Sequence, residues 1–155
     1  MKDKDRTQRV ICRNKQAGFR YEILAKIDCG IVLFGTEVKS LREGRGSLDE
    51  SFARINRDEL WVFGFHIGPY DAAAQRNQNA LRVRKLLLHK SELRKLIPKA
   101  EQRGLTLVPI LAYFNERGLV KIRLAVARGK SSRDKRQSLK EREHKREMDR
   151  ATRRR

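Results

Sequence analysis

Apolar and polar residues alternate along several stretches of the chain, a pattern typical of strands that bury one face. The stretches 105–114 and 119–128 flank Asn115-Glu-Arg-Gly118 and predict a hairpin that turns at these residues. Pro109 lies in the first arm. Because proline has no N–H to donate to a neighbouring strand, we expect it at a bulge or at a sheet edge.

A second hairpin is predicted where Ser51–Ile55 and Leu60–Ile67 flank Asn56-Arg-Asp-Glu59. The second arm is apolar on both faces, which is typical of a strand near the middle of a sheet. Trp61 lies in this apolar run. We therefore interpret it as a core residue in preference to a base-stacking platform.

The first strand of the fold is predicted at Tyr21–Ile27. Asp28 follows it and can cap a short helix at Cys29–Phe34. The β-branched Ile31 and Val32 would suit a strand equally well, so both structures are open for this segment.

Gly35–Arg42 predicts a strand when it is read with a period of two. Glu37 and Lys39 would then lie side by side on its exposed face. This face is either a solvated ion pair or, together with Arg42, part of a polar contact surface.

The main helix is predicted at 91–103, where apolar residues recur at helical spacing. Ser91 can cap its start and Gly104 can end it. Pro98 falls inside the helix and disfavours helical geometry at the preceding residue, so we expect a kink or two short helices. The apolar stripe is expected to plug a barrel or to cover a sheet.

The charge of the chain indicates a polyanionic partner. It has 38 Lys and Arg against 19 Asp and Glu in 155 residues, a net charge of +19. Nucleic acid is the first expectation and an anionic membrane surface the second. No apolar run approaches the ~20 residues of a membrane helix, and we expect no secretory signal. Cys12 and Cys29 form no CxxC pair, so free thiols in a reduced, cytoplasmic compartment are expected.

The segment 71–85 is predicted to be a long loop, and loops of this length in compact domains are usually functional or disordered. It ends in Arg82-Val-Arg-Lys85. These three cations are either solvated or in contact with phosphate, and the sequence favours neither.

Composition changes after Gly129 and predicts a barrel domain over 1–129, with a flexible arm at 1–13, and a basic tail over 130–155. The tail has 12 Lys and Arg against 5 acidic residues, and no aromatic residue. It cannot bury enough apolar surface to fold alone. Opposite charges recur at helical spacing, as in Glu141 and Lys145, so we expect a tail that is disordered when free and helical against RNA.

No pattern for catalysis or metal binding is found. The histidines are scattered, and neither a phosphate-binding glycine loop nor a nucleophile elbow is present. Four carboxylates could in principle form a hydrolytic site: Asp28, Glu37, Asp49 and Glu50. No spacing favours this over surface charge, so we expect no enzyme, no cofactor and no metal.

Together these elements predict a mainly β fold with helices: a small antiparallel barrel of the oligonucleotide-binding (OB) type, with one main helix, a short helix and a basic C-terminal tail. Such barrels bind nucleic-acid backbones in basic grooves, so the expected function is RNA binding.

Several blocks resemble one known family. In chain order these are Asn14-Lys15, Tyr21-Glu-Ile23, Gly30-Ile-Val-Leu33, Gly35-Thr-Glu-Val-Lys-Ser-Leu-Arg42, Arg84-Lys-Leu-Leu-Leu-His89, Gly104-Leu-Thr-Leu-Val-Pro109, Ala127-Arg-Gly-Lys130 and Asp134-Lys-Arg136. They closely resemble the small protein B family, the SsrA-binding proteins of bacterial trans-translation. The likeness extends over about residues 10–145.

The resemblance implies an OB-type barrel that binds the tRNA-like domain of tmRNA. It further implies delivery of alanyl-tmRNA, with elongation factor Tu, to ribosomes stalled on messages without a stop codon. The tail would then lie against 16S rRNA, in the empty mRNA path and the decoding centre. Nothing in the chain requires a dimer, so a monomer is expected.

Site residues follow from the resemblance position by position. The expected tmRNA-facing residues are Asn14, Lys15, Tyr21, Asp28, Glu37, Lys39 and Arg42, with Arg84 and Lys85 near them. The expected decoding-centre residues of the tail are Gly129, Lys130, Arg133, Asp134, Lys135 and Arg136.

The chain departs from the family pattern at a few positions. Phe19-Arg20 replace the usual histidine and acid, and Asp28 replaces the commoner glutamate. Arg133 stands where the family often has tyrosine or histidine. Since a guanidinium plane can also stack on a base, we expect Arg133 to keep that role.

Two alternatives belong to other classes. The first is a structural protein whose barrel and tail only neutralise rRNA. The second is a hydrolase that uses Asp28 or Glu37 with a divalent metal. A preference for tmRNA over bulk RNA distinguishes the adaptor from the first, and RNA cleavage would indicate the second.

Overall fold

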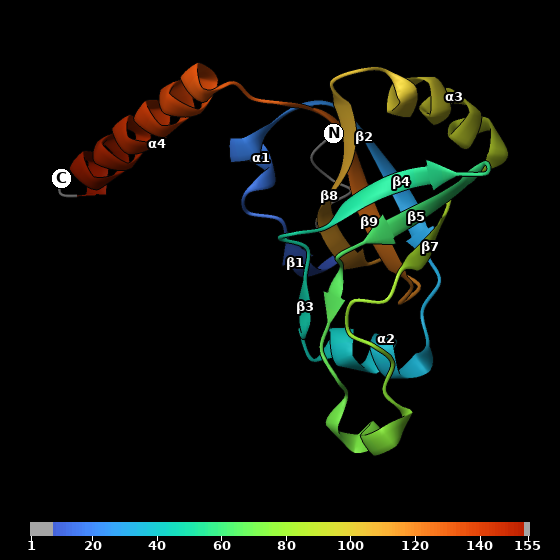
Figure 1. Ribbon diagram of the computed structural model, residues 1–155. Helices are drawn as coiled ribbons and strands as arrows, with labels where there is room; N and C mark the ends of the chain where they lie inside the picture. Colours follow the sequence, from blue (N-terminus) through green and yellow to red (C-terminus); the bar gives the residue numbers. More distant parts are fainter. Residues whose placement is uncertain (1–7, 154–155) are drawn as a thin grey trace.

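The structure is a computed structural model that describes residues 8–153 (Figure 1). Its strands are β1 (Arg9–Arg13), β2 (Tyr21–Ile31), β3 (Gly46–Ser47), β4 (Phe52–Asn56), β5 (Glu59–Phe63), β6 (His66–Ile67), β7 (Arg84–Leu87), β8 (Leu105–Phe114) and β9 (Val120–Gly129). Its helices are α1 (Ala17–Arg20), α2 (Gly35–Arg42), the 3-10 helix η1 (Asp71–Arg76), α3 (Lys90–Glu101) and α4 (Ser132–Arg153).

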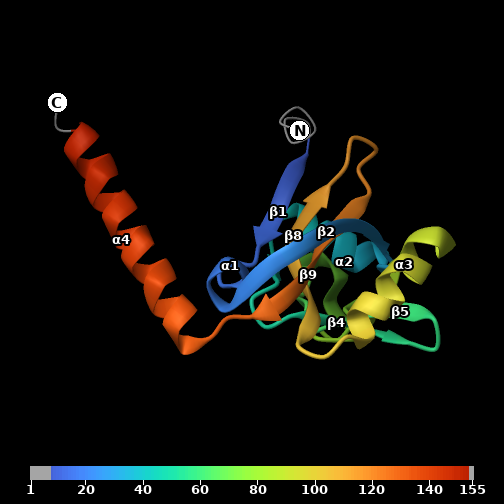
Figure 2. The same ribbon diagram turned by 90° about the horizontal axis from the view of Figure 1, so that it is seen from above.

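Seven strands form one antiparallel sheet in the order β1-β8-β4-β5-β7-β2-β9. Because β8 also pairs with β9, the six strands from β8 to β9 close into a barrel-like ring (Figures 1 and 2). The predicted mainly β, antiparallel fold with helices is therefore confirmed. The ring is joined between β4 and β8 by the single residue pair Ala53 and Leu107.

The core fills the inside of this ring. Its fully buried members come from strands and from helices alike; they include Leu41, Leu60, Val62, Leu96 and Ile122. A second, smaller cluster lies on the outer side of β8 and β9, where Ala17 of α1 packs against Val108, Ala125 and Ala127. The small alanine side chains allow α1 to lie close to the sheet.

Both predicted hairpins are present, but the arm predicted at 60–67 is divided into β5, which pairs with β4, and β6, which pairs with β3. β4 pairs with β5, and β8 pairs with β9 from Leu105–Arg128 to Phe114–Val120. The register of the β8–β9 hairpin shifts between Pro109 and Leu111, which confirms the bulge expected at the proline. Trp61, however, is only half-buried, because its neighbours Leu60 and Val62 occupy the inward face of β5. The interpretation of Trp61 as a core residue is wrong.

The first predicted strand is longer than expected. β2 runs through Asp28 to Ile31, and its last residues pair with both β9 and β7. The prediction of a helix at 29–34 capped by Asp28 is therefore wrong. Of the two β-branched residues noted above, Ile31 ends the strand and Val32 follows it, and Asp28 lies within the strand.

Gly35–Arg42 is a helix, α2, and the predicted strand is wrong. Its buried residues are Glu37, Ser40 and Leu41, a spacing that only a helix places on one side. The Glu37 carboxylate also accepts the N–H of Phe34 at 2.9 Å, which satisfies a backbone donor at the helix start. A stretch of eight residues can match the period of two of a strand and the period of 3.6 of a helix. The burial of these three side chains favours the helix.

Residues 9–13 are not part of a loose arm. They form β1, which pairs with β8 from Arg9–Phe114 to Arg13–Leu111. The remainder of the predicted arm, residues 1–7, lies outside the described residues.

α3 confirms the predicted main helix and its apolar stripe, since Leu96 is fully buried in the core. It begins after His89, whose N–H is accepted by the Glu92 carboxylate at 3.3 Å, rather than at Ser91. Pro98 does not divide the helix in two, since α3 runs unbroken from Lys90 to Glu101. The proline removes a single intrahelical hydrogen bond, the one that its own N–H would donate.

Candidate nucleic-acid interface

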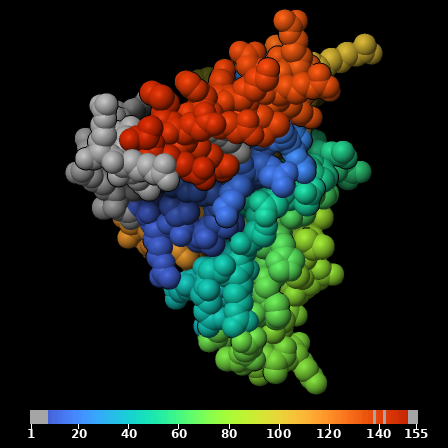
Figure 3. Space-filling view, turned by 90° about the vertical axis from the view of Figure 1, so that its left-hand side faces the viewer, coloured from blue at the N-terminus to red at the C-terminus, as the bar shows by residue number. Residues whose placement is uncertain are grey.

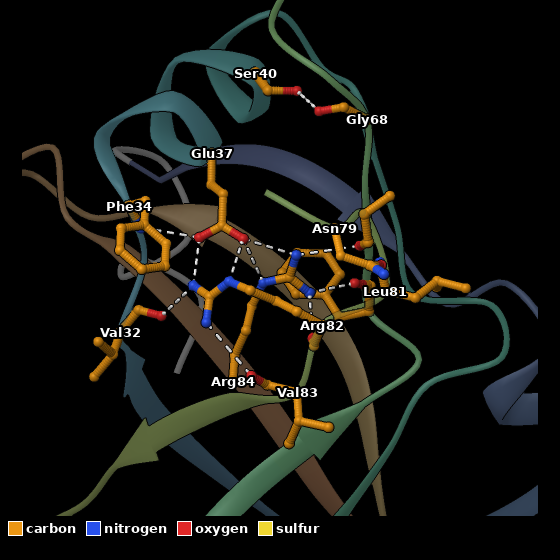
Figure 4. A network of polar contacts seen from close by, with 12 residues as sticks. Val32, Phe34, Glu37, Ser40, Gly68, Asn79, Leu81, Arg82, Val83 and Arg84 are labelled. Atoms are coloured by element: carbon orange, nitrogen blue, oxygen red, sulfur yellow. Dashed lines mark hydrogen bonds and ion pairs between the residues drawn. The ribbon is translucent and has the colours of Figure 1, made fainter. Parts of the chain in front are cut away.

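Glu37 and Arg84 form the centre of a buried ion network rather than an exposed surface (Figure 4). Arg84 Nε donates to Glu37 Oε1 at 2.9 Å, and Arg82 Nη2 donates to Glu37 Oε2 at 2.5 Å. The Glu37 and Arg84 side chains are 5% and 0% exposed. Glu37 was expected to face tmRNA and Arg84 to lie near that surface, whereas both side chains are closed off from solvent in this structure.

The network is fully hydrogen-bonded, as buried charges require. Arg84 Nη1 donates to the carbonyl of Phe65 at 2.6 Å, and Nη2 donates to that of Ala80 at 3.1 Å. The Arg82 guanidinium lies 4.6 Å from the centroid of the Phe34 ring. These contacts connect α2 to β7 and to the loop that precedes it.

The pKa of Glu37 reflects two opposing effects. Burial by itself raises the pKa, but hydrogen bonds from Arg82 and from the Phe34 N–H, with the charge of Arg84, lower it below its usual value. Burial lowers the pKa of Arg84, and Glu37 opposes that shift. Glu37 is therefore an ionised structural residue, unsuited to the carboxylate role in hydrolysis that the sequence left open.

Asn14 is also committed to the fold. Its Nδ2 donates to the carbonyls of Leu48 at 3.1 Å and Pro109 at 3.3 Å. Its Oδ1 accepts the backbone N–H groups of Gln16 and Ala17. Asn14 thus joins the segment before α1 to β8, whereas the neighbouring Lys15 is exposed.

Asp28 lies on the outer face of the sheet, where Arg123 of β9 donates to it from Nε at 2.8 Å. The Arg123 guanidinium also lies 5.5 Å from the ring centroid of Tyr113. Burial, followed by the charge of Asp28, raises the pKa of Tyr113. Asp28 also borders a hollow of about 450 Å³ next to Lys121 and the start of α3.

Arg123 was not among the expected site residues. The alternation of apolar and polar residues in 119–128 predicts that Arg123 points away from the core, and this was the only sign of its role in the sequence. Its partner Asp28 is 95 residues earlier in the chain. The strand register that pairs Asp28 with Arg123 cannot be read from either segment alone.

The remaining expected residues of the barrel divide by exposure. Lys39 and Arg42 project from α2 and are exposed, and Lys39 Nζ lies 5.5 Å from the centroid of the Tyr70 ring. Tyr21 is half-buried against the alanine cluster under α1. Lys85 is half-exposed on β7, where it pairs with Glu59 and lies 5.9 Å from the Trp61 ring centroid.

The tail leaves the barrel at Gly129, the last residue of β9. Lys130 attaches this point to α1, since its backbone N–H and its Nζ donate to the carbonyls of Arg20 and Gly18, both at 2.9 Å. Residues 132–153 then form α4, which extends away from the barrel (Figure 2). Figures 1 and 3 place α4 at the end of the molecule opposite α2 and η1.

α4 begins with a capping box. Ser131 Oγ accepts the N–H of Asp134, and the Asp134 carboxylate accepts the Ser131 N–H at 3.2 Å and its hydroxyl at 2.7 Å. These hydrogen bonds lower the pKa of Asp134. The spacing of Ser131 and Asp134 is the sequence signal that would have located this helix start.

The four expected decoding-centre residues of α4 lie in its first two turns. Arg133, Asp134 and Arg136 are exposed, and Lys135 is half-exposed. α4 presents little apolar surface: Leu139 and Met148 are 45% and 58% exposed. The first turns thus offer charged groups to solvent, with Asp134 occupied by the cap.

Cys12 and Cys29 are free thiols. Burial, with nearby acidic charge, raises their pKa values to about 11 and about 12. Within residues 8–153, no three His, Cys, Asp or Glu side chains are grouped to hold a metal ion. Nor does any helix of that part of the chain have the length and apolarity needed to cross a membrane.

Comparison with known proteins gives one consistent result. The family model described as SmpB protein matches residues 11–154. An SsrA-binding protein of Syntrophobacter fumaroxidans is 51% identical over 147 residues, which cover 95% of this chain and 91% of the relative. An SsrA-binding protein of Thermosynechococcus vestitus is 53% identical over 144 residues, which cover 92% of this chain and 94% of the relative.

A solved structure described as "tmRNA-SmpB: a journey to the center of the bacterial ribosome" has a similar chain. The two are 50% identical with a TM-score of 0.67, and the match covers 78% of this chain and 85% of that one. The likeness in sequence and in fold therefore extends over most of both molecules. On these matches, the chain belongs to the SmpB protein family.

Proposed function

We propose that this chain is an RNA-binding adaptor that binds the tRNA-like domain of tmRNA and delivers it to stalled ribosomes for trans-translation. The observation that carries the proposal is the near-complete match, at about half identity, to relatives named SsrA-binding protein. The similar chain from the solved structure of tmRNA-SmpB and the bacterial ribosome supports the same partners.

The proposed tmRNA surface consists of the expected residues that reach solvent. Lys15, Lys39, Arg42 and Lys85 supply cations for phosphates, and Asp28 with Arg123 supplies groups that can hydrogen-bond to bases and 2′-hydroxyls. Tyr21 contributes its half-exposed edge. Asn14, Glu37 and Arg84 act indirectly, by holding α1 and α2 in place.

The proposed ribosome contact is the tail. Gly129 and Lys130 set its departure from the barrel, and Arg133, Lys135 and Arg136 face the decoding centre and 16S rRNA, with Asp134 beginning the helix. Arg133 stacks on an rRNA base. Arg133→Ala should therefore reduce peptide tagging in a reconstituted stalled-ribosome assay, and unchanged tagging would reject this role.

In this proposal the chain acts as a monomer, in the cytoplasm, together with elongation factor Tu and alanyl-tmRNA. It performs no chemistry on the RNA. Incubation with tmRNA and Mg²⁺ should leave the RNA intact, and cleavage would favour the hydrolase alternative.

The direct test is filter binding of tmRNA, tRNA and duplex RNA across a range of salt concentrations. Affinity for all three should fall steeply with salt, because each phosphate contact releases counterions. The adaptor additionally requires a preference for tmRNA that persists at physiological salt. Equal affinity for all three RNAs would instead indicate a protein that only neutralises rRNA.

A further inference from the structure

The outer face of β4, β5 and β7 carries aromatic side chains between charged ones, where a solvated sheet face is normally polar throughout. Leu60 and Val62 point into the core, so Trp61 and Phe63 point outward, opposite Arg54 and Phe52 of β4. No described helix crosses these strands, which face the viewer in Figure 1. We call this surface the aromatic face; it consists of Phe52, Arg54, Trp61, Phe63, Val83 and Lys85.

Two of the rings of this face are stacked on each other. Phe52 and Phe63 stack with ring centroids 5.2 Å apart and planes inclined by 7°. The Arg54 guanidinium lies 5.0 Å from the Phe52 centroid, and Lys85 Nζ lies 5.9 Å from that of Trp61. Phe52 remains 36% exposed and Val83 43% exposed. An exposed apolar patch of this kind marks an interaction site.

Aromatic rings next to cations are the composition of surfaces that bind unpaired nucleotides, where bases stack on the rings and phosphates contact the cations. The charge distribution favours such a ligand over a protein. Arg54 and Lys85 are positive, Glu59 beside them is paired with Lys85, and the chain carries +19. We propose that the aromatic face binds unpaired bases of single-stranded or loop RNA.

This inference rests on the proposed function only in that the ligand is RNA. The residues involved are, apart from Lys85, separate from the proposed tmRNA surface at Asp28 and α2. The aromatic face would hold a second, looped-out or single-stranded RNA segment while the other surface is occupied.

Trp61 provides a local reporter, because it is the only tryptophan of the chain. The full-length protein is titrated with a single-stranded oligoribonucleotide of about eight nucleotides and with a duplex of the same length. Stacking of a base should quench the Trp61 fluorescence saturably with the single strand and not with the duplex. The absence of quenching by the single strand would overturn the proposal and leave a protein as the better ligand. Equal quenching by both would overturn it in favour of unspecific RNA binding through phosphates.

Two variants strengthen the test. Phe52→Leu removes an exposed ring and should weaken single-strand binding by about 5- to 150-fold, the range for loss of one stacked base. Arg54→Gln should make the salt dependence shallower by about 0.7 in log–log slope, the value for one phosphate contact with a single strand. Arg54 is exposed, so this variant serves if Phe52→Leu fails to fold.

The matched control is Leu119→Ala, which removes an exposed apolar side chain from the turn between β8 and β9 and should leave binding unchanged. Wild-type affinity of Phe52→Leu would overturn the aromatic face as the site. The two proposals also fail separately. Quenching of Trp61 without a preference for tmRNA in filter binding would reject the adaptor alone, and the converse would reject the aromatic face alone.

Discussion

Glu37 illustrates how a single residue can connect distant parts of this fold. It accepts hydrogen bonds from arginines 45 and 47 residues away in the chain, and it also accepts the N–H at the start of its own helix. Removing one partner of a buried ion pair is costly because the other charge is left without compensation. Glu37 should therefore matter for stability far more than its place beside Lys39 suggested.

Glu37→Gln should destabilise the protein by about 3–5 kcal/mol, because the buried Arg84 would lose its counter-charge. Urea unfolding followed by circular dichroism measures this difference. Glu59→Gln is the matched control, since the Lys85–Glu59 pair is 38% and 43% exposed and such pairs contribute about 1 kcal/mol or less. Similar losses for the two variants would show that the network contributes no more than a surface pair.

The lowered pKa of Glu37 predicts a pH dependence with a definite sign. The ionised form is favoured in the folded protein, so its contribution is complete above the ordinary value of 4.5 and is lost as the pH falls through the lower, folded value. The stability advantage of the wild type over Glu37→Gln should thus be constant near neutrality and shrink below about pH 4.5. An advantage that instead grows on acidification would contradict the assignment.

At the level of single residues, sequence reasoning identified exposure more reliably than partners. Lys15, Lys39 and Arg42 are exposed as expected, since isolated cations outside apolar runs rarely find buried partners. Arg84 follows the same compositional pattern but is buried, because Glu37 from another element compensates its charge.

Among the elements, the hairpins were predictable and the segment 29–42 was not. Strong turn residues fixed the β4–β5 and β8–β9 connections, and alternation over ten residues in β9 left little ambiguity. Gly35–Arg42 has only eight residues, and a period of two fits it nearly as well as a helix. Glu37, Ser40 and Leu41 are all buried against the rest of the protein, and only the helical conformation places these three residues on one side.

The capping box of α4 leads to a prediction for the tail. An isolated 130–155 peptide should show little helix in plain buffer, because charge pairs on its surface contribute only ~0.2–0.5 kcal/mol each. Ser131→Ala should reduce any helix that forms, since loss of an N-cap costs ~1 kcal/mol. Circular dichroism measures both effects.

Ser132→Ala is the control for that experiment, because Ser132 lies one residue inside the helix and makes no part of the cap described above. Equal effects of the two substitutions would argue against the cap. A stable helix in the peptide without RNA would overturn the prediction of a tail that is disordered when free.

For the whole molecule, the separation between barrel and tail predicts separable functions. Ending the chain after Gly129 removes α4 and Lys130 but leaves every strand of the ring in place. Filter binding of tmRNA should survive this truncation with a shallower salt dependence, whereas ribosome-dependent tagging should fail. Loss of both activities would place the tmRNA site in the tail.

β1 has a consequence for the front of the chain. It pairs Cys12, Arg13 and their neighbours with the margin of β8 from Leu111 to Phe114, a part of β8 that β4 does not reach. In a protein that begins at residue 14, the main-chain donors and acceptors of β8 at Leu111–Phe114 would lose their partner strand. The aromatic Tyr113 and Phe114 lie in the same segment. Open margins of this kind recruit strands from other molecules. Such a protein should self-associate, which analytical ultracentrifugation would detect. Removal of residues 1–13 would thus convert the proposed monomer into an aggregating species.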